Sequence, residues 1–87
     1  MPEYCVTLNR SARKELNNLN TSVLQRIFPK IEALGDDPHP KGSRKIQGHQ
    51  NLWRIRVGDY RVIYSHDETE KSVNIVAVRH RREAYRF

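Results

Sequence analysis

The sequence is poor in cysteine and lacks long apolar runs, and each absence excludes a class of protein. Cys5 is its single cysteine, so no internal disulfide can form, and we expect a reduced, cytoplasmic setting. No stretch approaches the ~18 consecutive apolar residues of a membrane-spanning helix, so we expect no membrane attachment. No apolar segment follows Met1, so we also expect no signal peptide.

Metal-binding and glycine-rich motifs are missing as well. The four histidines are scattered along the sequence without the spacing of a metal site. The four glycines are isolated, so there is no glycine-rich loop of the kind that cradles a nucleotide phosphate. A Ser/His/Asp arrangement is not excluded, although nothing in the sequence indicates one. We therefore expect neither a metal ion nor another cofactor.

Positive charge is what the sequence has in excess. Sixteen lysines and arginines stand against ten acidic residues, a net charge of +6 over 87 residues. Residues 44–87 hold ten of the basic and five of the acidic side chains, and arginine dominates there. Arginine presents a planar set of donors that suits phosphate or carboxylate, so we expect a nucleic-acid ligand or an acidic protein partner. A chain of this length predicts a single domain over residues 1–87.

Apolar periodicity predicts a helical first half. Residues 4–8 are expected to form a short strand, and two helices follow, capped by Asn9 or Ser11 and by Thr21 or Ser22. Few residues join the helices, so they should form an antiparallel hairpin. The buried face of the second helix is expected to comprise Leu24, Ile27, Phe28, Ile31 and Leu34.

An interior proline and a change of period complete the predicted fold. Pro29 predicts a kink or break in the second helix. From Ser43 onward the apolar period becomes two, with alternating runs on either side of Gly58-Asp59 and an apolar run over residues 73–78. The expected order is β-α-α-β-β-β. It predicts an α+β fold, with an antiparallel sheet of about four to five strands and an N-terminal helical hairpin packed on one face.

A two-residue turn at Gly58-Asp59 places Arg56 opposite Arg61. One face of this hairpin then carries Trp53, Ile55, Val57, Tyr60, Val62 and Tyr64, which suits packing against the helices. The other face carries Arg54, Arg56, Arg61 and Ile63. Like charges directly opposite each other destabilise a sheet by up to about 1 kcal/mol, and a bound phosphate or carboxylate would reverse that effect. The alternative is an ordinary solvated face.

The C-terminal run adds His80, Arg81, Arg82 and Tyr85. If the last strand neighbours the hairpin, its end projects these groups toward the same edge of the sheet. RNA carries its own nucleophile, the 2′-hydroxyl. A protein that cleaves it need only align the attack, neutralise the developing charge and move two protons. Arginines together with a tyrosine or a histidine meet that requirement without a metal.

Residues 53–64 (WRIRVGDYRVIY) and residues 80–85 (HRREAY) carry a family resemblance. Over essentially its whole length, the chain resembles the RelE toxins of bacterial and archaeal type II toxin–antitoxin modules. The resemblance implies an mRNA endonuclease that works in the ribosomal A site and inhibits translation. It also implies cleavage through the 2′-hydroxyl, which leaves a cyclic 2′,3′-phosphate and a 5′-hydroxyl.

The resemblance also implies roles for individual residues. Arg61 matches the arginine credited with stabilising the transition state, and Arg81 matches the basic residue at the end of the last strand. Tyr85 matches a tyrosine that stacks on the substrate base or transfers a proton, and proton transfer falls to Tyr85 or His80. The predicted catalytic residues are Arg61, Arg81, Tyr85 and His80. The predicted phosphate-binding residues are Arg54, Arg56, Arg82 and Lys45.

The implied partners are a cognate antitoxin in a heterodimer or heterotetramer, and the ribosome with its mRNA. Promoter DNA is contacted indirectly through the antitoxin. Two alternatives stay open: a non-enzymatic inhibitor of DNA gyrase of the ParE kind, and a basic nucleic-acid-binding module without activity. ParE-like chains typically lack the HRREAY-type ending and the paired basic strand, so the sequence favours the endoribonuclease.

Overall fold

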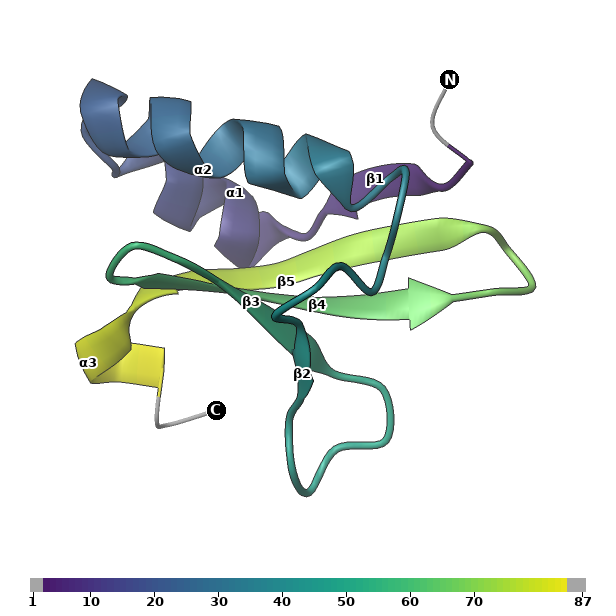
Figure 1. Ribbon diagram of the computed structural model, residues 1–87. Coiled ribbons are helices and arrows are strands. Elements are labelled where there is room, and N and C mark those ends of the chain that lie inside the picture. Colours follow the sequence, from purple (N-terminus) through teal and green to yellow (C-terminus); the bar gives the residue numbers. More distant parts are fainter. Residues whose placement is uncertain (1–2, 85–87) are drawn as a thin grey trace.

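In the computed structural model, which describes residues 3–84, two helices cover one face of a five-stranded sheet (Figure 1). The strand order is β1-β5-β4-β3-β2, and a short third helix follows the last strand. The elements are β1 (Cys5–Leu8), α1 (Arg10–Asn17), α2 (Thr21–Ala33), β2 (Arg44–Lys45), β3 (Trp53–Val57), β4 (Tyr60–Asp67), β5 (Ser72–His80) and α3 (Arg81–Ala84). No helix within the described residues is long and apolar enough to cross a membrane.

Both helices of the hairpin begin after a capping asparagine. The Asn9 side chain accepts a hydrogen bond from the Ala12 amide at 2.9 Å, and Asn20 caps α2 in the same way at 3.0 Å. Each cap satisfies an amide that the first turn of a helix leaves without a partner. The prediction of Asn9 is confirmed, whereas the cap of α2 lies before the two predicted positions, Thr21 and Ser22.

The long helix α2 buries a narrower stripe than the sequence predicts. Ile27 and Ile31 are buried, but Phe28 is 44% exposed because it lies outside that stripe. The helix also continues through Pro29, so the predicted break is wrong. Pro29 and Gln25, whose carbonyl loses its helical partner, both lie on the exposed side of α2, where water can satisfy the carbonyl.

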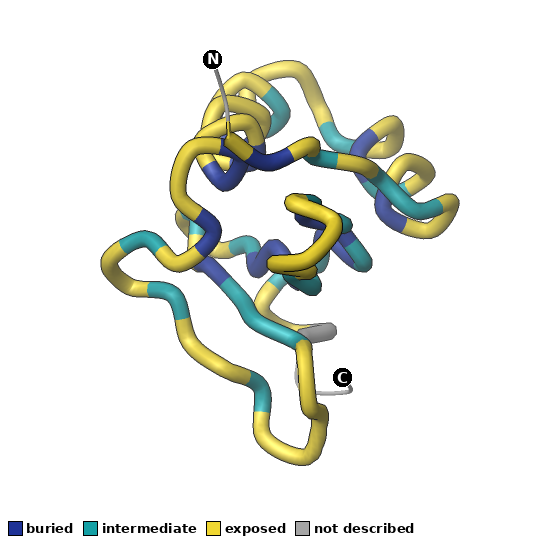
Figure 2. The backbone as a smooth tube through the Cα atoms, turned by 90° about the vertical axis from the view of Figure 1, so that its right-hand side faces the viewer, coloured by how far each residue is buried: buried dark blue, intermediate teal, exposed yellow. Residues whose placement is uncertain are grey.

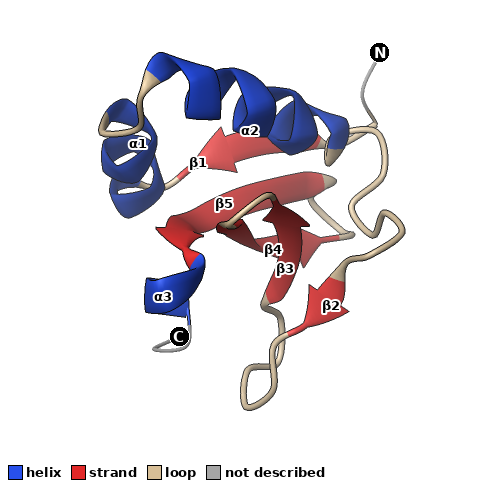
Figure 3. Ribbon diagram, turned by 60° about the vertical axis from the view of Figure 1, so that its left-hand side comes forward, coloured by secondary structure: helices blue, strands red, loops and turns tan. Residues whose placement is uncertain are grey.

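Three of the four strand pairings are antiparallel as predicted, and one is parallel. β2 pairs with β3, β3 with β4 and β4 with β5 in antiparallel fashion, whereas β1 lies parallel to β5, with Val6 beside Val73. The α+β class and the helical hairpin on one face are confirmed (Figure 3). The expectation of a purely antiparallel sheet is wrong at β1, which the chain inserts at the sheet edge beside its last strand.

The β3–β4 hairpin has the predicted register in all of its pairs. Gly58 has a φ of 61°, the left-handed conformation that glycine supplies at the first central position of a II′ turn. The Arg81 amide donates a hydrogen bond to the Asp59 carbonyl at 2.7 Å. The start of α3 is therefore tied to this turn.

The main core fills the space between the helical hairpin and the sheet. Figure 2 shows the buried positions gathered there, while most of the loop between β2 and β3 is exposed. The sheet contributes Ile55, Val62, Tyr64, Val73, Ile75 and Val78 to this core. On the other face, Ile63 and Ala77 are paired directly and are also buried. Because α3 packs against β4 and β5, part of that face is covered.

Candidate nucleic-acid interface

The strand register places arginines in directly opposed pairs across four strands. Arg44 lies opposite Arg54, and Arg61 lies between Arg56 on one side and Arg79 on the other. Directly paired residues share a face, and this face is opposite to the one that packs against α1 and α2. We call these five residues the arginine row. The predicted opposition of Arg56 and Arg61 is confirmed.

The members of the arginine row differ in burial. Arg61, the second residue of the central strand β4, is only 7% exposed. Arg54 is half-buried and Arg56 is exposed. An anion that contacts Arg61 would lie where the protein screens charge less than water does, so its attraction to the guanidinium would be strengthened. The row therefore combines a sheltered cation with accessible ones.

Arg79 is held by a carboxylate from α1. Its Nε donates to Oε2 of Glu15 at 3.1 Å, and Oε1 of Glu15 accepts from the Val78 amide at 3.0 Å. Glu15 thus accepts a hydrogen bond from a backbone amide on the edge of β5, at a position past the end of the pairing between β1 and β5. Within residues 3–84, by contrast, no carboxylate pairs with Arg54 or Arg56. Their charges are available to a ligand.

A basic hollow of about 390 Å³ lies at the β2 end of the arginine row. Its lining residues are Lys41, Gly42, Arg44, Arg54, Ile55 and Arg56. None of these is acidic, and four of them are cationic. Arginine and lysine donors around one hollow suit a phosphate group, which accepts charge-assisted hydrogen bonds.

Lys45 does not share the face of the arginine row. It pairs with Trp53 across the strands, and its Nζ lies 6.0 Å from the centroid of the Trp53 ring. Trp53 packs against the main core, so Lys45 is directed to the helix side of the sheet. The structure therefore does not bring this predicted phosphate-binding residue to the row, and Arg44 stands there instead.

His80 also lies apart from the arginine row. It pairs with Tyr60, and the two rings meet edge to face with centroids 5.3 Å apart. Tyr60 packs against the main core, which places His80 on the opposite face from Arg79, its neighbour in β5. β5 neighbours the hairpin as expected, but strand alternation separates His80 from Arg61.

Arg81 and Arg82 are exposed at the start of α3. The hydrogen bond from the Arg81 amide to Asp59 holds this segment beside the β3–β4 turn, close to the end of the arginine row. The Arg82 amide donates to Nδ1 of His80 at 3.3 Å. The predicted catalytic residue Tyr85 lies outside the described residues.

Three cations of the interface are absent from the predicted site. Arg44 and Arg79 join the arginine row, and Lys41 lines the basic hollow. Alternation within β2 could have identified Arg44 in place of Lys45 once the edge strand was recognised. The positions of Arg79 and Lys41 depend on a strand register and a loop path that no local pattern encodes.

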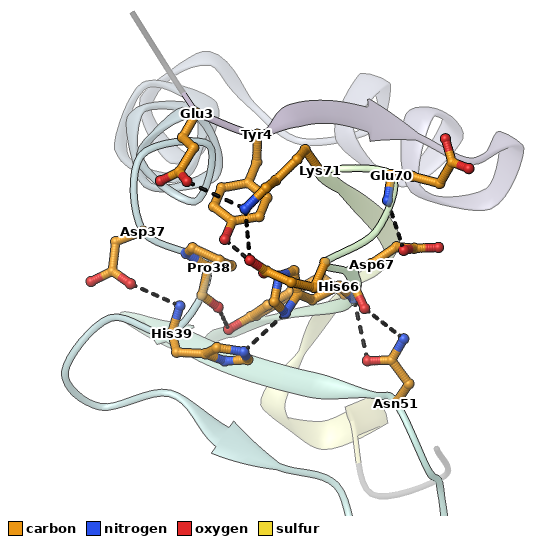
Figure 4. Close-up of polar contacts among 12 residues, drawn as sticks. Glu3, Tyr4, Asp37, Pro38, His39, Asn51, His66, Asp67, Glu70 and Lys71 are labelled. Atoms are coloured by element: carbon orange, nitrogen blue, oxygen red, sulfur yellow. Dashed lines mark hydrogen bonds and ion pairs between the residues drawn. The ribbon is translucent and has the colours of Figure 1, made fainter.

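A polar network anchors the loop that leads to the basic hollow (Figure 4). The Tyr64 hydroxyl donates to the Pro38 carbonyl at 2.6 Å, and ring nitrogens of His39 and His66 lie 3.1 Å apart. Burial raises the pKa of Tyr64 to about 12, and burial also lowers the pKa of His39. Because Pro38 and His39 shortly precede Lys41, these contacts restrict where Lys41 can lie.

Glu68 is the charged centre of this network. Its carboxylate accepts hydrogen bonds from Lys71 and Tyr4, each at 2.7 Å, and lies 2.9 Å from Nε2 of His66. The hydrogen bond from Lys71, and to a lesser extent the one from Tyr4, lowers the pKa of Glu68 to about 2.

Within the described part of the chain, no group of three or more His, Cys, Asp or Glu side chains could hold a metal ion.

Comparison with known proteins agrees with this architecture. Residues 6–85 match the family model described as ParE toxin of type II toxin–antitoxin system, parDE. The candidate toxin RelE1 of Methanocaldococcus jannaschii is 26% identical, over 97% of each chain. The RelE–RelB complex from Pyrococcus horikoshii is similar with a TM-score of 0.80 and 29% identity, over 93% of this chain and 98% of that one. The toxin–antitoxin complex RelBE2 of Mycobacterium tuberculosis also gives 0.80, at 24% identity, over 92% and 99% of the two chains.

Proposed function

The chain belongs to the ParE toxin family of type II toxin–antitoxin systems, within the RelE/ParE superfamily, and from this premise we propose that it is a ribosome-dependent mRNA endoribonuclease. It cuts mRNA in the ribosomal A site and so inhibits translation. A cognate antitoxin neutralises it, in line with the RelB-bound complexes among its structural neighbours.

The arginine row is the observation that best supports this activity. Opposed arginines on adjacent strands weaken a sheet, by roughly 0.2–1 kcal/mol for each pair. Successive phosphates of a single RNA strand convert this repulsion into attraction at several points at once. The basic hollow at one end of the row and Arg81 at the other extend the surface in both directions. RNA laid across the strands meets cations along this path.

The chemistry uses the nucleophile of the RNA itself. The 2′-oxygen loses its proton and attacks the adjacent phosphorus, the bond from phosphorus to the 5′-oxygen breaks, and that oxygen takes up a proton. Arg61, sheltered at the centre of the row, stabilises the charge that develops on the phosphoryl oxygens. Arg54 and Arg56 position the phosphate, and Arg81 contacts the substrate near the cut.

Proton transfer needs a group that can change its charge. Arginine is effectively always protonated, so the row is unsuited to this step. His80 lies on the opposite face of the sheet from Arg61. We therefore assign proton transfer to Tyr85, which follows α3 directly in the sequence. Phosphate contacts near the β2 end fall to Arg44 and Lys41, with Arg82 adding charge at the α3 end.

Mapping of mRNA 5′ ends on translating ribosomes tests this function. We expect wild-type protein to produce cuts within A-site codons, and Arg61→Ala to slow cleavage by on the order of 10²–10³-fold, the usual effect of losing one charge-stabilising donor. Arg13→Ala, a change of an exposed arginine on α1, is the matched control and should cut normally. Because Arg61 is buried, antitoxin binding and melting temperature are measured alongside, and Arg61→Lys serves as a milder variant. Normal cleavage by a folded Arg61→Ala protein would contradict the proposed role.

The matching family model is described as a ParE toxin, which favours keeping the alternative left open by the sequence, a non-enzymatic inhibitor of DNA gyrase of the ParE kind, as a second candidate. This activity requires binding to gyrase and no cleavage of RNA. A supercoiling assay with purified gyrase separates the two candidates. Inhibited supercoiling together with intact mRNA would favour gyrase, whereas unaffected supercoiling with A-site cuts favours the endoribonuclease.

A further inference from the structure

A second hollow lies at the tip of the β3–β4 hairpin, on the helix side of the sheet. Its volume is about 480 Å³, and it is enclosed by the first half of α2, the β3–β4 turn and the end of β5. Apolar side chains of α2 and β3 form its floor. Its polar rim consists of Arg26, Asp59, Tyr60 and His80. A hollow of this size with an apolar floor and a few polar groups suits a small planar ligand.

The Arg26 guanidinium lies close over the turn, where there is room for it because Gly58 has no side chain. A Cβ atom at Gly58 would lie 2.5 Å from Nη2 of Arg26, so any other residue would displace the guanidinium. Among residues 3–84, Arg26 forms no hydrogen bond or ion pair. Its in-plane N–H donors and its stacking face are therefore available to a ligand in the hollow.

The rest of the rim supplies an aromatic edge, a donor and an acceptor. Tyr60 and His80 meet edge to face, and the Arg82 amide occupies Nδ1 of His80, so the neutral imidazole carries its hydrogen on Nε2. Asp59 offers carboxylate oxygens as acceptors. Because the charges of Asp59 and Arg26 offset each other, the hollow suits a neutral group with mixed donors and acceptors better than a bare phosphate.

We propose that this hollow receives one unpaired nucleobase of the same RNA strand whose backbone lies on the arginine row. Single-stranded RNA is recognised by bases that stack on aromatic or guanidinium planes while their edges form hydrogen bonds. The row and the hollow lie on opposite faces of the sheet, but Arg56 and Arg61 are only two residues from the turn. An RNA strand that leaves the row would therefore pass around Gly58-Asp59 to place a base in the hollow. The inference rests on the proposed endoribonuclease function and extends its substrate site beyond the cut.

Single-turnover cleavage on programmed ribosomes tests the hollow, with Arg26→Gln as the variant and Lys30→Gln, one turn further along α2, as the charge-matched control. We expect Arg26→Gln to raise the protein concentration for half-maximal cleavage about tenfold, because the variant loses the guanidinium plane on which the base stacks. Lys30→Gln should change it less than about twofold, in line with an exposed residue outside the hollow.

Messenger RNAs with one abasic nucleotide at each position flanking the cut identify the base. At one position the abasic RNA should weaken wild-type cleavage as much as Arg26→Gln does, and the two changes together should add nothing further. Three results would overturn the assignment: Arg26→Gln behaving like Lys30→Gln, losses that add at every position, or a defect confined to antitoxin binding. If wild-type protein cuts no mRNA, the proposed function itself fails. If the wild-type protein cuts mRNA and Arg26→Gln cuts it equally well, the base-binding role of the hollow is refuted and the endoribonuclease function is not.

Discussion

Arg56 lies directly opposite Arg61, and like charges in this position disfavour sheet pairing but suit an anionic ligand. Their direct opposition on β3 and β4 places like charges side by side, with Arg79 beyond them. Glu15 offsets the charge of Arg79 from α1, but no carboxylate of the described chain pairs with Arg56. Replacing Arg56 should therefore separate stability from RNA binding, because it removes a repulsive neighbour of Arg61 and the proposed phosphate contact together.

For Arg56→Gln we expect unchanged or slightly higher stability and weaker binding to programmed ribosomes. Loss of one phosphate contact should reduce the slope of log affinity against log salt concentration by about one. Binding titrations over a series of potassium chloride concentrations measure that slope. Lys14→Gln on α1 removes the same charge away from the row and should leave the slope nearly unchanged. Equal slopes for Arg56→Gln and wild type would count against phosphate contact at this position.

Gly58 and Gly48 form a matched pair for testing the packing of Arg26. Both have positive φ, at 61° and 84°, but only a Cβ at Gly58 would meet Arg26, and Gly48 has open space around it. Both alanine variants should lose about 1–3 kcal/mol from backbone strain. Gly58→Ala should also move Arg26 and weaken RNA binding, whereas Gly48→Ala should not displace it. Urea unfolding and ribosome binding measure the two effects, and equal RNA affinity for both variants would contradict the contact.

At the scale of elements, the sequence predicts those strand pairings that depend on neighbouring residues, such as the two strands of a tight hairpin. The alternation on either side of Gly58-Asp59 determines every pair between β3 and β4, and the sequence therefore predicts that Arg56 lies opposite Arg61. The face of His80 depends instead on how β5 pairs with β4, and that pairing includes an irregularity at Ile63/Tyr64.

Strand direction and contacts between residues far apart in the sequence are poorly predicted from short segments. The direction of β1 depends on which edge of the sheet it joins. The residue pattern of so short a strand does not distinguish a parallel neighbour from an antiparallel one. The ion pair between Arg79 and Glu15 links β5 to α1, and its two residues are 64 positions apart in the sequence. Sequence alternation could have placed Arg44 in the site, because Lys45 occupies the other face of the same edge strand.

The polar network around Glu68 gives its segment a predictable response to acid. The folded pKa of Glu68 is about 2, below the ordinary value of 4.5, so its ionised form stabilises the folded state. That contribution is fully present above about pH 4.5 and is lost as pH falls through about 2, since the unfolded chain takes up the proton first. Melting temperature measured from pH 7 to pH 2 should fall less steeply in Glu68→Gln than in wild type.

Glu70→Gln is the control for this measurement. Glu70 is an exposed carboxylate in the same turn, and its side chain forms no ion pair with the described residues. Its acid profile should match that of the wild type. Because Glu68 is exposed, solvent screening limits the size of its effect, and the shape of the profile is the informative quantity. Identical profiles for Glu68→Gln and wild type would show that the bonds from Lys71 and Tyr4 do not persist in solution.

At the scale of the whole molecule, the cations of the proposed RNA-binding surface also make a stabilising partner favourable. The net charge of +6 is concentrated in the half that forms β2 to α3, so the molecule repels itself on one face. A chain of this size buries only roughly 60–65% of the surface exposed when unfolded, which leaves little reserve of stability. The proposed antitoxin would offset both weaknesses if it presents acidic side chains to this face.

Antitoxin binding should therefore raise the melting temperature in proportion to the logarithm of free antitoxin concentration. A ligand specific for the folded state stabilises it by about 2.7 kcal/mol at one hundred times its dissociation constant. Differential scanning fluorimetry with increasing cognate antitoxin measures the shift, and calorimetry supplies the affinity independently. If the antitoxin covers the arginine row, Arg56→Gln should reduce both quantities together. Tight binding without a thermal shift would mean that the antitoxin holds the unfolded chain equally well, and neutralisation would then proceed by capture of unfolded toxin.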